Sequence, residues 1–237
     1  MAEAFQDVPT RALAIYAHPD DPEVSCGGVL ARWALAGSEV YAVVATQGDK
    51  GSADPATDGA ALARRREAEA RSAGEVLGLA GVEFLGHPDG ELGAAPSLVR
   101  ELVEVVRRLK PDVVVGVDPT AVFFGDAYVN HVDHRCIGWA TLDAVAPAAS
   151  SPRYFPDQGP AHQVRTVLLS GTIEPDVWVD VEATLDAKVR AMFCHRSQLA
   201  DDADEWLPAF VRQRAADEGR RAGLRFAEGF RRLRLAR

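Results

Sequence analysis

The chain has 237 residues, with 26 Lys and Arg against 35 Asp and Glu, which gives a formal net charge of −9. Its 47% hydrophobic residues can form a core, which excludes an intrinsically disordered protein, and its three widely spaced cysteines exclude a disulfide scaffold. No apolar run approaches the roughly 18 residues of a membrane span, and the acidic N-terminus does not resemble a signal peptide, so we expect a cytoplasmic protein.

Strand-like and helix-like segments alternate along the first half of the chain. Short apolar runs typical of buried strands occupy residues 12–17, 39–46, 82–85 and 112–117. Helices are predicted between them, at residues 27–36, 60–78 and 98–109. The polar segments 47–54 and 87–90 follow two of these strands and are predicted to be loops.

The second half continues the alternation and ends in a basic segment. A helix is predicted at about 133–145, then a surface loop over 147–160 that is rich in Pro, Ser and Gly. Strands at 164–169 and 177–181 and a helix at 185–198 follow. From about residue 204 to 237 we predict a basic helical segment, because Phe226, Phe230 and Leu233 recur at helical spacing.

This order of elements predicts one α/β domain over residues 1–237, with a mostly parallel, doubly wound sheet. Ligands of such sheets bind outside the carboxyl ends of the strands. The polar residues that directly follow the predicted strands are therefore the candidates for function.

Two such segments combine imidazoles and carboxylates. His18, Asp20 and Asp21 follow the first long strand, and the run 130–134 (Asn-His-Val-Asp-His) follows the strand that ends at 117. His18 and Asp21, with a third ligand from either His131 or His134, would form a three-ligand metal site with an open position, as in catalytic zinc sites. Either segment alone could be a capped turn, but their joint position at two strand ends favours a functional site.

The remaining residues of these segments suggest roles in catalysis. Asp20 could take a proton from a metal-bound water, whose pKa the metal would lower to roughly 7. His131 and Asp133 could form an oriented imidazole–carboxylate pair that stabilises negative charge or protonates a leaving group. The set is suited to metal-assisted hydrolysis of an amide.

The sequence Ala-His-Pro-Asp-Asp at 17–21, the glycines at 27–28 and the run 131–134 together resemble the PIG-L/LmbE-like zinc deacetylases. The resemblance extends from about residue 11 to 198. It implies a Rossmann-like fold with helices on both faces of the sheet, and one Zn²⁺ per chain bound by His18, Asp21 and His134. Fe²⁺ is an alternative metal. The resemblance also implies Asp20 as general base, with His131, supported by Asp133, as electrostatic stabiliser or acid.

Three further residues match family positions that line the substrate pocket. They are Arg66 in an Arg-x-x-Glu-Ala helix, Asp89 in His-Pro-Asp-Gly, and His195 in His-Arg-Ser-Gln. A surface arginine, an ordinary turn aspartate and a packing histidine are the structural alternatives. The chain departs from the family where Val132 replaces a proline and where Tyr128 lies one residue before the expected tyrosine position.

The resemblance implies a hydrolase that removes an N-acetyl group from an N-acetylated amino sugar or its conjugate. The alternatives are an amidase that cleaves a larger acyl group from a mycothiol-type conjugate, and a non-catalytic sugar-binding sensor. Relatives often form trimers or hexamers, so a homo-oligomer is possible. The Arg-rich end could contact nucleic acid. Residues 212–237 carry nine Arg against three acidic residues, so the remainder of the chain has a net charge of −15, which argues against a broad nucleic-acid surface.

Overall fold

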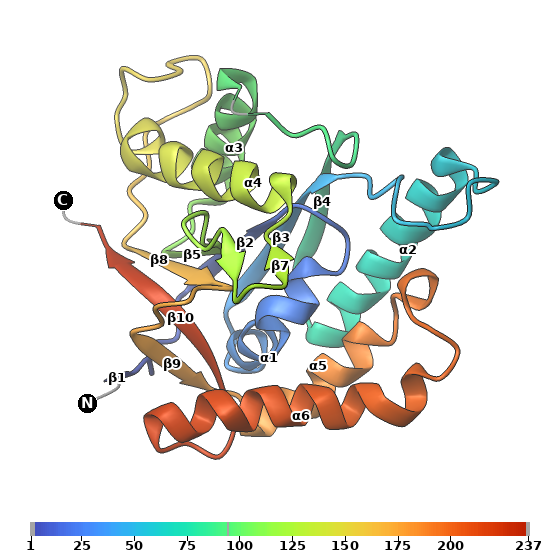
Figure 1. Cartoon of the computed structure of the whole chain (residues 1–237). Coiled ribbons are helices and arrows are strands. Elements are labelled where there is room, and N and C mark those ends of the chain that lie inside the picture. Colours follow the sequence, from blue (N-terminus) through green and yellow to red (C-terminus); the bar gives the residue numbers. More distant parts are fainter. Residues whose placement is uncertain (1–2, 94, 236–237) are drawn as a thin grey trace.

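The fold is taken from a computed structural model that describes residues 3–93 and 95–235 (Figure 1). Within these residues an eight-stranded sheet has the order β1-β9-β10-β8-β5-β2-β3-β4. Its strands are β1 Glu3–Ala4, β2 Arg11–Tyr16, β3 Glu39–Thr46, β4 Gly81–His87, β5 Val113–Val117, β8 Thr166–Ser170, β9 Val177–Asp180 and β10 Ala227–Arg234. Neighbouring strands are parallel except that β10 runs antiparallel to both β8 and β9.

Helices cover both faces of this sheet, as Figure 1 shows. One face carries α1 Asp21–Leu35, α2 Gly59–Leu77, α5 Leu185–Met192 and α6 Ala203–Ala222. The other carries α3 Pro96–Leu109 and α4 Val132–Asp143, which continues into η1 Ala144–Ala149. The predicted mostly parallel α/β architecture is therefore confirmed.

Residue types explain the central strands and the helix ends. Every residue of β5 is buried, since a central parallel strand covered by helices on both faces needs apolar side chains on both sides. Helix α3 begins with Pro96 in its first turn, where a missing N–H breaks no hydrogen bond, and ends before Pro111. Helix α2 ends at Gly78, whose φ of 77° is the left-handed conformation that glycine adopts without strain.

The strand order places a ligand site beside β2. From β2 the chain passes through α1 to β3 and through α2 to β4 on one side, and α3 then carries it back to β5 on the other side of β2. The loops that follow β2 and β5 consequently part at the topological switch point, where open α/β sheets bind their ligands.

The prediction of a helix throughout 204–237 is wrong beyond residue 222. Helix α6 ends at Gly223, whose φ is 70°, and residues 227–234 form β10 between β8 and β9. Helical spacing of the apolar residues is outweighed by a ladder of main-chain pairs, in which Phe230 pairs with Val177 and Arg231 with Leu169. Residues 236–237 of the predicted segment lie outside the described residues.

Smaller differences concern helix ends and one hairpin. Helix α1 begins at Asp21 instead of residue 27. The helix expected over 185–198 ends at Met192, and a short 3₁₀ turn lies on each side of it, η2 Glu182–Thr184 before it and η3 Arg196–Gln198 after it. Strands β6 Phe123–Phe124 and β7 Tyr128–Val129 form a hairpin that was not predicted, because strands of two residues are too short to show an alternating pattern. Over residues 3–93 and 95–235, no helix is long and apolar enough to cross a membrane.

Candidate active site

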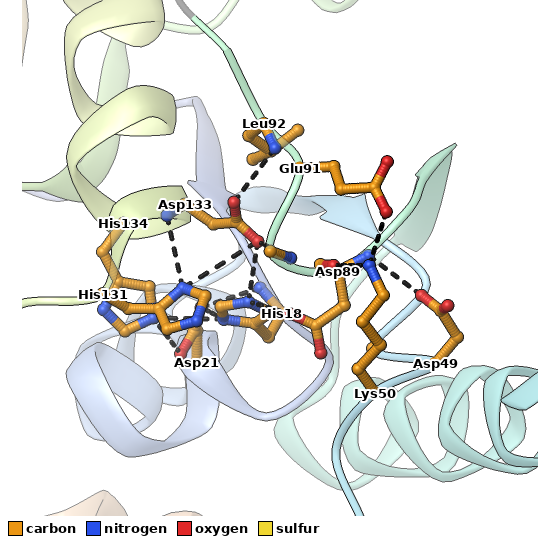
Figure 2. Close-up of polar contacts among 12 residues, drawn as sticks. His18, Asp21, Asp49, Lys50, Asp89, Glu91, Leu92, His131, Asp133 and His134 are labelled. Atoms are coloured by element: carbon orange, nitrogen blue, oxygen red, sulfur yellow. Dashed lines mark hydrogen bonds and ion pairs between the residues drawn. The ribbon is translucent and has the colours of Figure 1, made fainter.

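The three predicted metal ligands meet the predicted catalytic residues His131 and Asp133 at the carboxyl end of the sheet, as Figure 2 shows. His18 and Asp21 come from the turn between β2 and α1, and Asp89 comes from the loop after β4. His131 and His134 come from the first turn of α4. Three segments that are far apart in sequence therefore supply one cluster.

Three side chains of this cluster place their donor atoms at the spacing of a metal site. His18 Nδ1 lies 3.2 Å from His134 Nε2 and 3.3 Å from an Asp21 carboxylate oxygen, and the other Asp21 oxygen lies 3.2 Å from His134 Nε2. Ligands of a tetrahedral zinc ion, with bonds of roughly 2.0–2.1 Å, are about 3.3–3.4 Å apart. The donor set His-Asp-His and its spacing therefore fit a metal ion such as zinc, and His131 is not part of this triad.

The other ring nitrogen of His18, Nε2, lies between two carboxylates. Its Nε2 lies 3.1 Å from Asp89 Oδ1 and 3.2 Å from Asp133 Oδ2. Burial alone would lower the pKa of His18, but hydrogen bonds to Asp21 and Asp89 raise it to about 10. For Asp21, burial would raise the pKa, and the hydrogen bonds to His134 and His18 hold it far below its usual range instead. So much negative charge around one imidazole favours a bound cation.

Asp133 contacts different groups from those the sequence led us to expect. Its carboxylate, fully buried, accepts hydrogen bonds from Gly90 N at 2.6 Å and Leu92 N at 3.0 Å. The distance from Asp133 Oδ2 to His131 Nδ1 is 3.9 Å, too long for a hydrogen bond. Asp133 therefore holds the loop after β4 and the outer nitrogen of His18. Its expected pairing with His131 is a charge contact at 3.9 Å without a hydrogen bond.

His131 is oriented by the backbone of α4 instead. It is the N-cap of the helix, and its Nδ1 accepts the main-chain N–H of Asp133 at 3.2 Å. A neutral ring with Nδ1 as acceptor carries its proton on Nε2, which is then free to donate. Burial, followed by the charge of His18, lowers the pKa of His131 below its usual value. Its side chain is 41% exposed, so it can reach a substrate.

Asp20 has an unusual backbone conformation and an electrostatically perturbed carboxyl. Its φ of 114° is rare for any residue other than glycine, and such strain persists only where the surroundings hold it. Burial is the largest cause that raises its pKa to about 7, the Asp21 charge adds to this, and Arg66 opposes it. Asp20 directly precedes Asp21 in the chain, and its carboxylate is not one of the clustered donor groups.

Arg66 is part of the structure that holds Asp20. Only 3% exposed, it donates to Pro19 O at 2.7 Å and to Gly48 O at 3.1 Å, and it lies 3.3 Å from an Asp20 oxygen. Gly48 has a φ of 61°, a left-handed conformation that glycine adopts without strain, and its lack of a Cβ atom leaves room for the guanidinium group. The arginine expected to bind substrate thus directs both of its terminal nitrogens at protein carbonyls, while its Nε has no hydrogen-bond partner among the described residues. Its neighbours Arg64 and Arg65 are exposed.

Loop contacts fix Asp89, and the structure adds a residue that sequence reasoning did not single out. Asp89 N donates to Asp49 Oδ1 at 2.9 Å, and Lys50 Nζ donates to Asp89 O at 2.5 Å (Figure 2).

Asn130, which is buried, has its Oδ1 3.0 Å from His134 Nδ1. This contact directs the other ring nitrogen of His134 toward the donor triad. The only sequence signal for Asn130 was its place at the start of the 130–134 run.

His195 is not one of the clustered donor groups. It is buried with its Nε2 3.2 Å from a Glu23 oxygen. Burial would lower the pKa of His195, but the Glu23 carboxylate raises it above its usual value, and the resulting charge in turn lowers the pKa of Asp20. His195 therefore pairs with Glu23, and its charge favours the ionised form of Asp20.

Comparison with known proteins assigns the family. A family model described as PIG-L, GlcNAc-PI de-N-acetylase, matches residues 13–145. The chain is 31% identical to a diacetylchitobiose deacetylase of Thermococcus kodakarensis over 97% of this chain and 85% of the relative. It is 28% identical to a 1D-myo-inositol 2-acetamido-2-deoxy-alpha-D-glucopyranoside deacetylase of Kineococcus radiotolerans, over 86% of this chain and 73% of the relative.

Solved structures agree with this assignment. The N,N'-diacetylchitobiose deacetylase of Pyrococcus horikoshii, solved with an inhibitor, superposes with a TM-score of 0.86 at 29% identity. The match covers 95% of this chain and 84% of that one. The sheet, the cluster at its carboxyl end and these similarities together confirm the predicted resemblance. The chain belongs to the PIG-L family.

Proposed function

We propose that the chain is a zinc-dependent hydrolase that removes the acetyl group from an N-acetylated amino sugar or its conjugate. The observation that carries the metal assignment is the triad of side chains His18, Asp21 and His134, whose donor atoms are separated by 3.2–3.3 Å. The substrate class is supported by the relatives, whose names specify diacetylchitobiose and a GlcNAc–inositol conjugate. A cytoplasmic location and a homo-oligomeric state stay predictions of the sequence.

Zinc held by the three side chains would lower the pKa of a bound water and polarise the acetamide carbonyl. Asp20 is positioned by Arg66 to take the proton of the attacking water. His131 Nε2–H would donate to the oxyanion that forms as the carbonyl carbon becomes tetrahedral. The proton held by Asp20 then passes to the departing amine nitrogen as the C–N bond breaks, which yields acetate and a free amino sugar.

The pocket residues have supporting roles in this proposal. Arg66 positions Asp20, and Asp89, of which one oxygen faces His18, lies at the edge of the cluster where a sugar hydroxyl could be accepted. His195 acts on Asp20 through its charge and its contact with Glu23. These assignments modify the expectation that all three residues contact substrate directly.

Acetate release from a panel of N-acetyl sugars, including N-acetylglucosamine and diacetylchitobiose, tests the reaction. Asp20→Asn should keep the metal, measured by elemental analysis, and lose about 10²–10⁴-fold in turnover, because the proton acceptor is gone. Asp126→Asn, at an exposed position in the turn between β6 and β7, is the matched control and should be fully active. Near-native turnover by Asp20→Asn would refute the assignment of the base.

A series of N-acyl glucosamines distinguishes acetyl removal from the alternatives. A deacetylase should lose activity as the acyl chain lengthens from acetyl to butyryl. Faster release of a larger acyl group would favour the amidase alternative. Saturable sugar binding without amine release from any substrate, by protein that contains its metal, would favour the sensor.

A further inference from the structure

Helix α1 is interrupted one turn after the metal-binding residues. Cys26 has φ −145° and ψ 19°, which are not helical values, and it separates the first turn from the rest of the helix. In a regular helix Gly28 N–H would donate to Val24 O. Here Val24 O accepts from Lys188 Nζ at 2.9 Å, and Gly28 N donates to Glu228 Oε1 at 3.1 Å.

The two side chains that take over this hydrogen bond form an ion pair with each other. Lys188 Nζ and Glu228 Oε1 are 2.6 Å apart, and the residues are 8% and 6% exposed. The second Glu228 oxygen accepts from Val29 N at 2.9 Å. A side chain inserted into the main-chain ladder is a known cause of helix kinks, and here a cation lies at the end of one helical segment and an anion at the start of the next.

The two glycines at the break leave room for this pair. A Cβ atom on Gly28 would lie 3.1 Å from Glu228 Oε1 and 2.9 Å from Val181, and one on Gly27 would lie 3.3 Å from Lys188 Cγ. Thr184 Oγ1 also donates to Gly28 O at 2.7 Å. The Gly27-Gly28 pair of the sequence is thus explained by close packing, and α1 lies directly against α5 in Figure 1.

The turn before the break carries the site. Asp21 belongs to it, and Val24, whose carbonyl Lys188 binds, itself donates its N–H to Asp20 O at 3.0 Å. The strained φ of Asp20 requires support from both ends. Arg66 supports the preceding residue, Pro19, and the Lys188 contact supports the turn that follows.

We propose that Lys188 and Glu228 are positioning residues that hold the first turn of α1, and with it Asp20 and Asp21, in the geometry needed for metal binding and catalysis. This inference rests on the proposed function. Both residues lie outside the 13–145 segment matched by the family model, so the C-terminal part of the chain completes a site whose ligands all lie within that segment.

Lys188→Met and Glu228→Gln each break the ion pair while nearly keeping side-chain volume. We expect zinc affinity, measured by chelator competition, to fall about 10- to 100-fold, as for other groups that orient metal ligands. At saturating zinc, kcat should fall by about the same factor because Asp20 is displaced, while KM stays near the native value. Hydrogen exchange should show faster exchange of the amides of residues 21–29.

Two controls separate positioning from general stability. Leu207→Ala, in the buried face of α6, lowers stability without touching the break. Glu218→Ala removes the acceptor of a hydrogen bond from Trp178 Nε1 in the same C-terminal region. Both should keep native zinc affinity and kcat. If Lys188→Met and Glu228→Gln do so too, although their melting temperatures fall, the pair is merely structural and the proposal is wrong.

The zinc measurement also keeps this inference separate from the proposed reaction. If the native chain releases no acetate from any substrate but binds zinc, and both variants bind it more weakly, the proposed function fails and the positioning of the metal ligands stands. If the native chain deacetylates its substrate and the two variants match it in zinc affinity and kcat, the proposed function stands and the positioning role fails.

Discussion

Replacement of Arg66 by methionine tests whether this residue positions Asp20 or binds substrate. The guanidinium donates to two backbone carbonyls, Pro19 O and Gly48 O, and is almost fully buried. A hydrogen bond to a charged group contributes about 1.5–3 kcal/mol, so the loss of two should lower the free energy of unfolding by about 3–6 kcal/mol. Domains are stable by about 5–15 kcal/mol, so Arg66→Met should fold but be clearly weakened.

The kinetic expectation follows from the same contacts. Without Arg66 the strained backbone at Asp20 loses one of its supports, so kcat should fall about 100-fold, the loss expected for a misplacement of about 1 Å. KM should change little, because the guanidinium already donates to protein groups. Urea unfolding and acetate-release kinetics on the same preparation measure both effects.

The matched control is the neighbouring arginine. Arg65 is exposed and pairs with Glu69 one turn further along α2, so Arg65→Met should change the free energy of unfolding by less than about 1 kcal/mol and leave kcat unaltered. An Arg66→Met variant of native stability and kcat but strongly raised KM would refute the positioning role. It would support the substrate contact that the family resemblance implied.

Two further outcomes concern the metal cluster. Zinc present at roughly 100 times its Kd stabilises a protein by about 2.7 kcal/mol. Its removal by a chelator should therefore lower the melting temperature by about 5–10 °C, and added zinc should restore it. An unchanged melting curve would contradict the proposed metal site. Asp133→Asn replaces one carboxylate oxygen by an amide group, so the main-chain N–H of Gly90 or Leu92 loses its acceptor and the contact with His18 is weakened. We expect zinc affinity, measured by chelator competition, to fall about 10- to 100-fold. Unaltered affinity would show that this carboxylate does not orient His18.

The metal-binding residues could be predicted because they occur as short motifs at strand ends. His18 and Asp21 are three residues apart at the end of β2, and the fold's switch point brings His134 to them. Choosing His134 over His131 required the family resemblance, since spacing alone left both open. In the structure His134 Nε2 lies 3.2 Å from an Asp21 oxygen, while His131 lies near His18, Asp89 and Asp133. The choice of His134 stays a prediction.

The partners of the functional side chains could not be predicted, because they depend on contacts between distant segments. Asp133 accepts from the loop after β4, about forty residues away, and not from its neighbour His131. Glu228 and Gly28 are 200 residues apart, and no local pattern relates them. A sequence indicates which groups can carry charge, whereas their pairing is decided by tertiary packing.

The C-terminal strand offers a direct test of the competing periodicities. As a helix, the segment would place Phe226, Phe230 and Leu233 on one apolar face, and all three should contribute similarly to stability. In β10, Phe230 is fully buried in the core, while Phe226, just before the strand, and Leu233 are half-buried at its margin.

Phe230→Ala should therefore lower the free energy of unfolding by about 3–5 kcal/mol, as for a fully buried phenylalanine, and Phe226→Ala and Leu233→Ala by about 1 kcal/mol each. Urea unfolding of the three variants decides between the patterns. Because Glu228 lies on the same face of β10 as Phe230, two positions away, the Phe230 variant should also weaken zinc binding. Equal losses at the three positions would mean that the helical pattern describes this segment better than the strand.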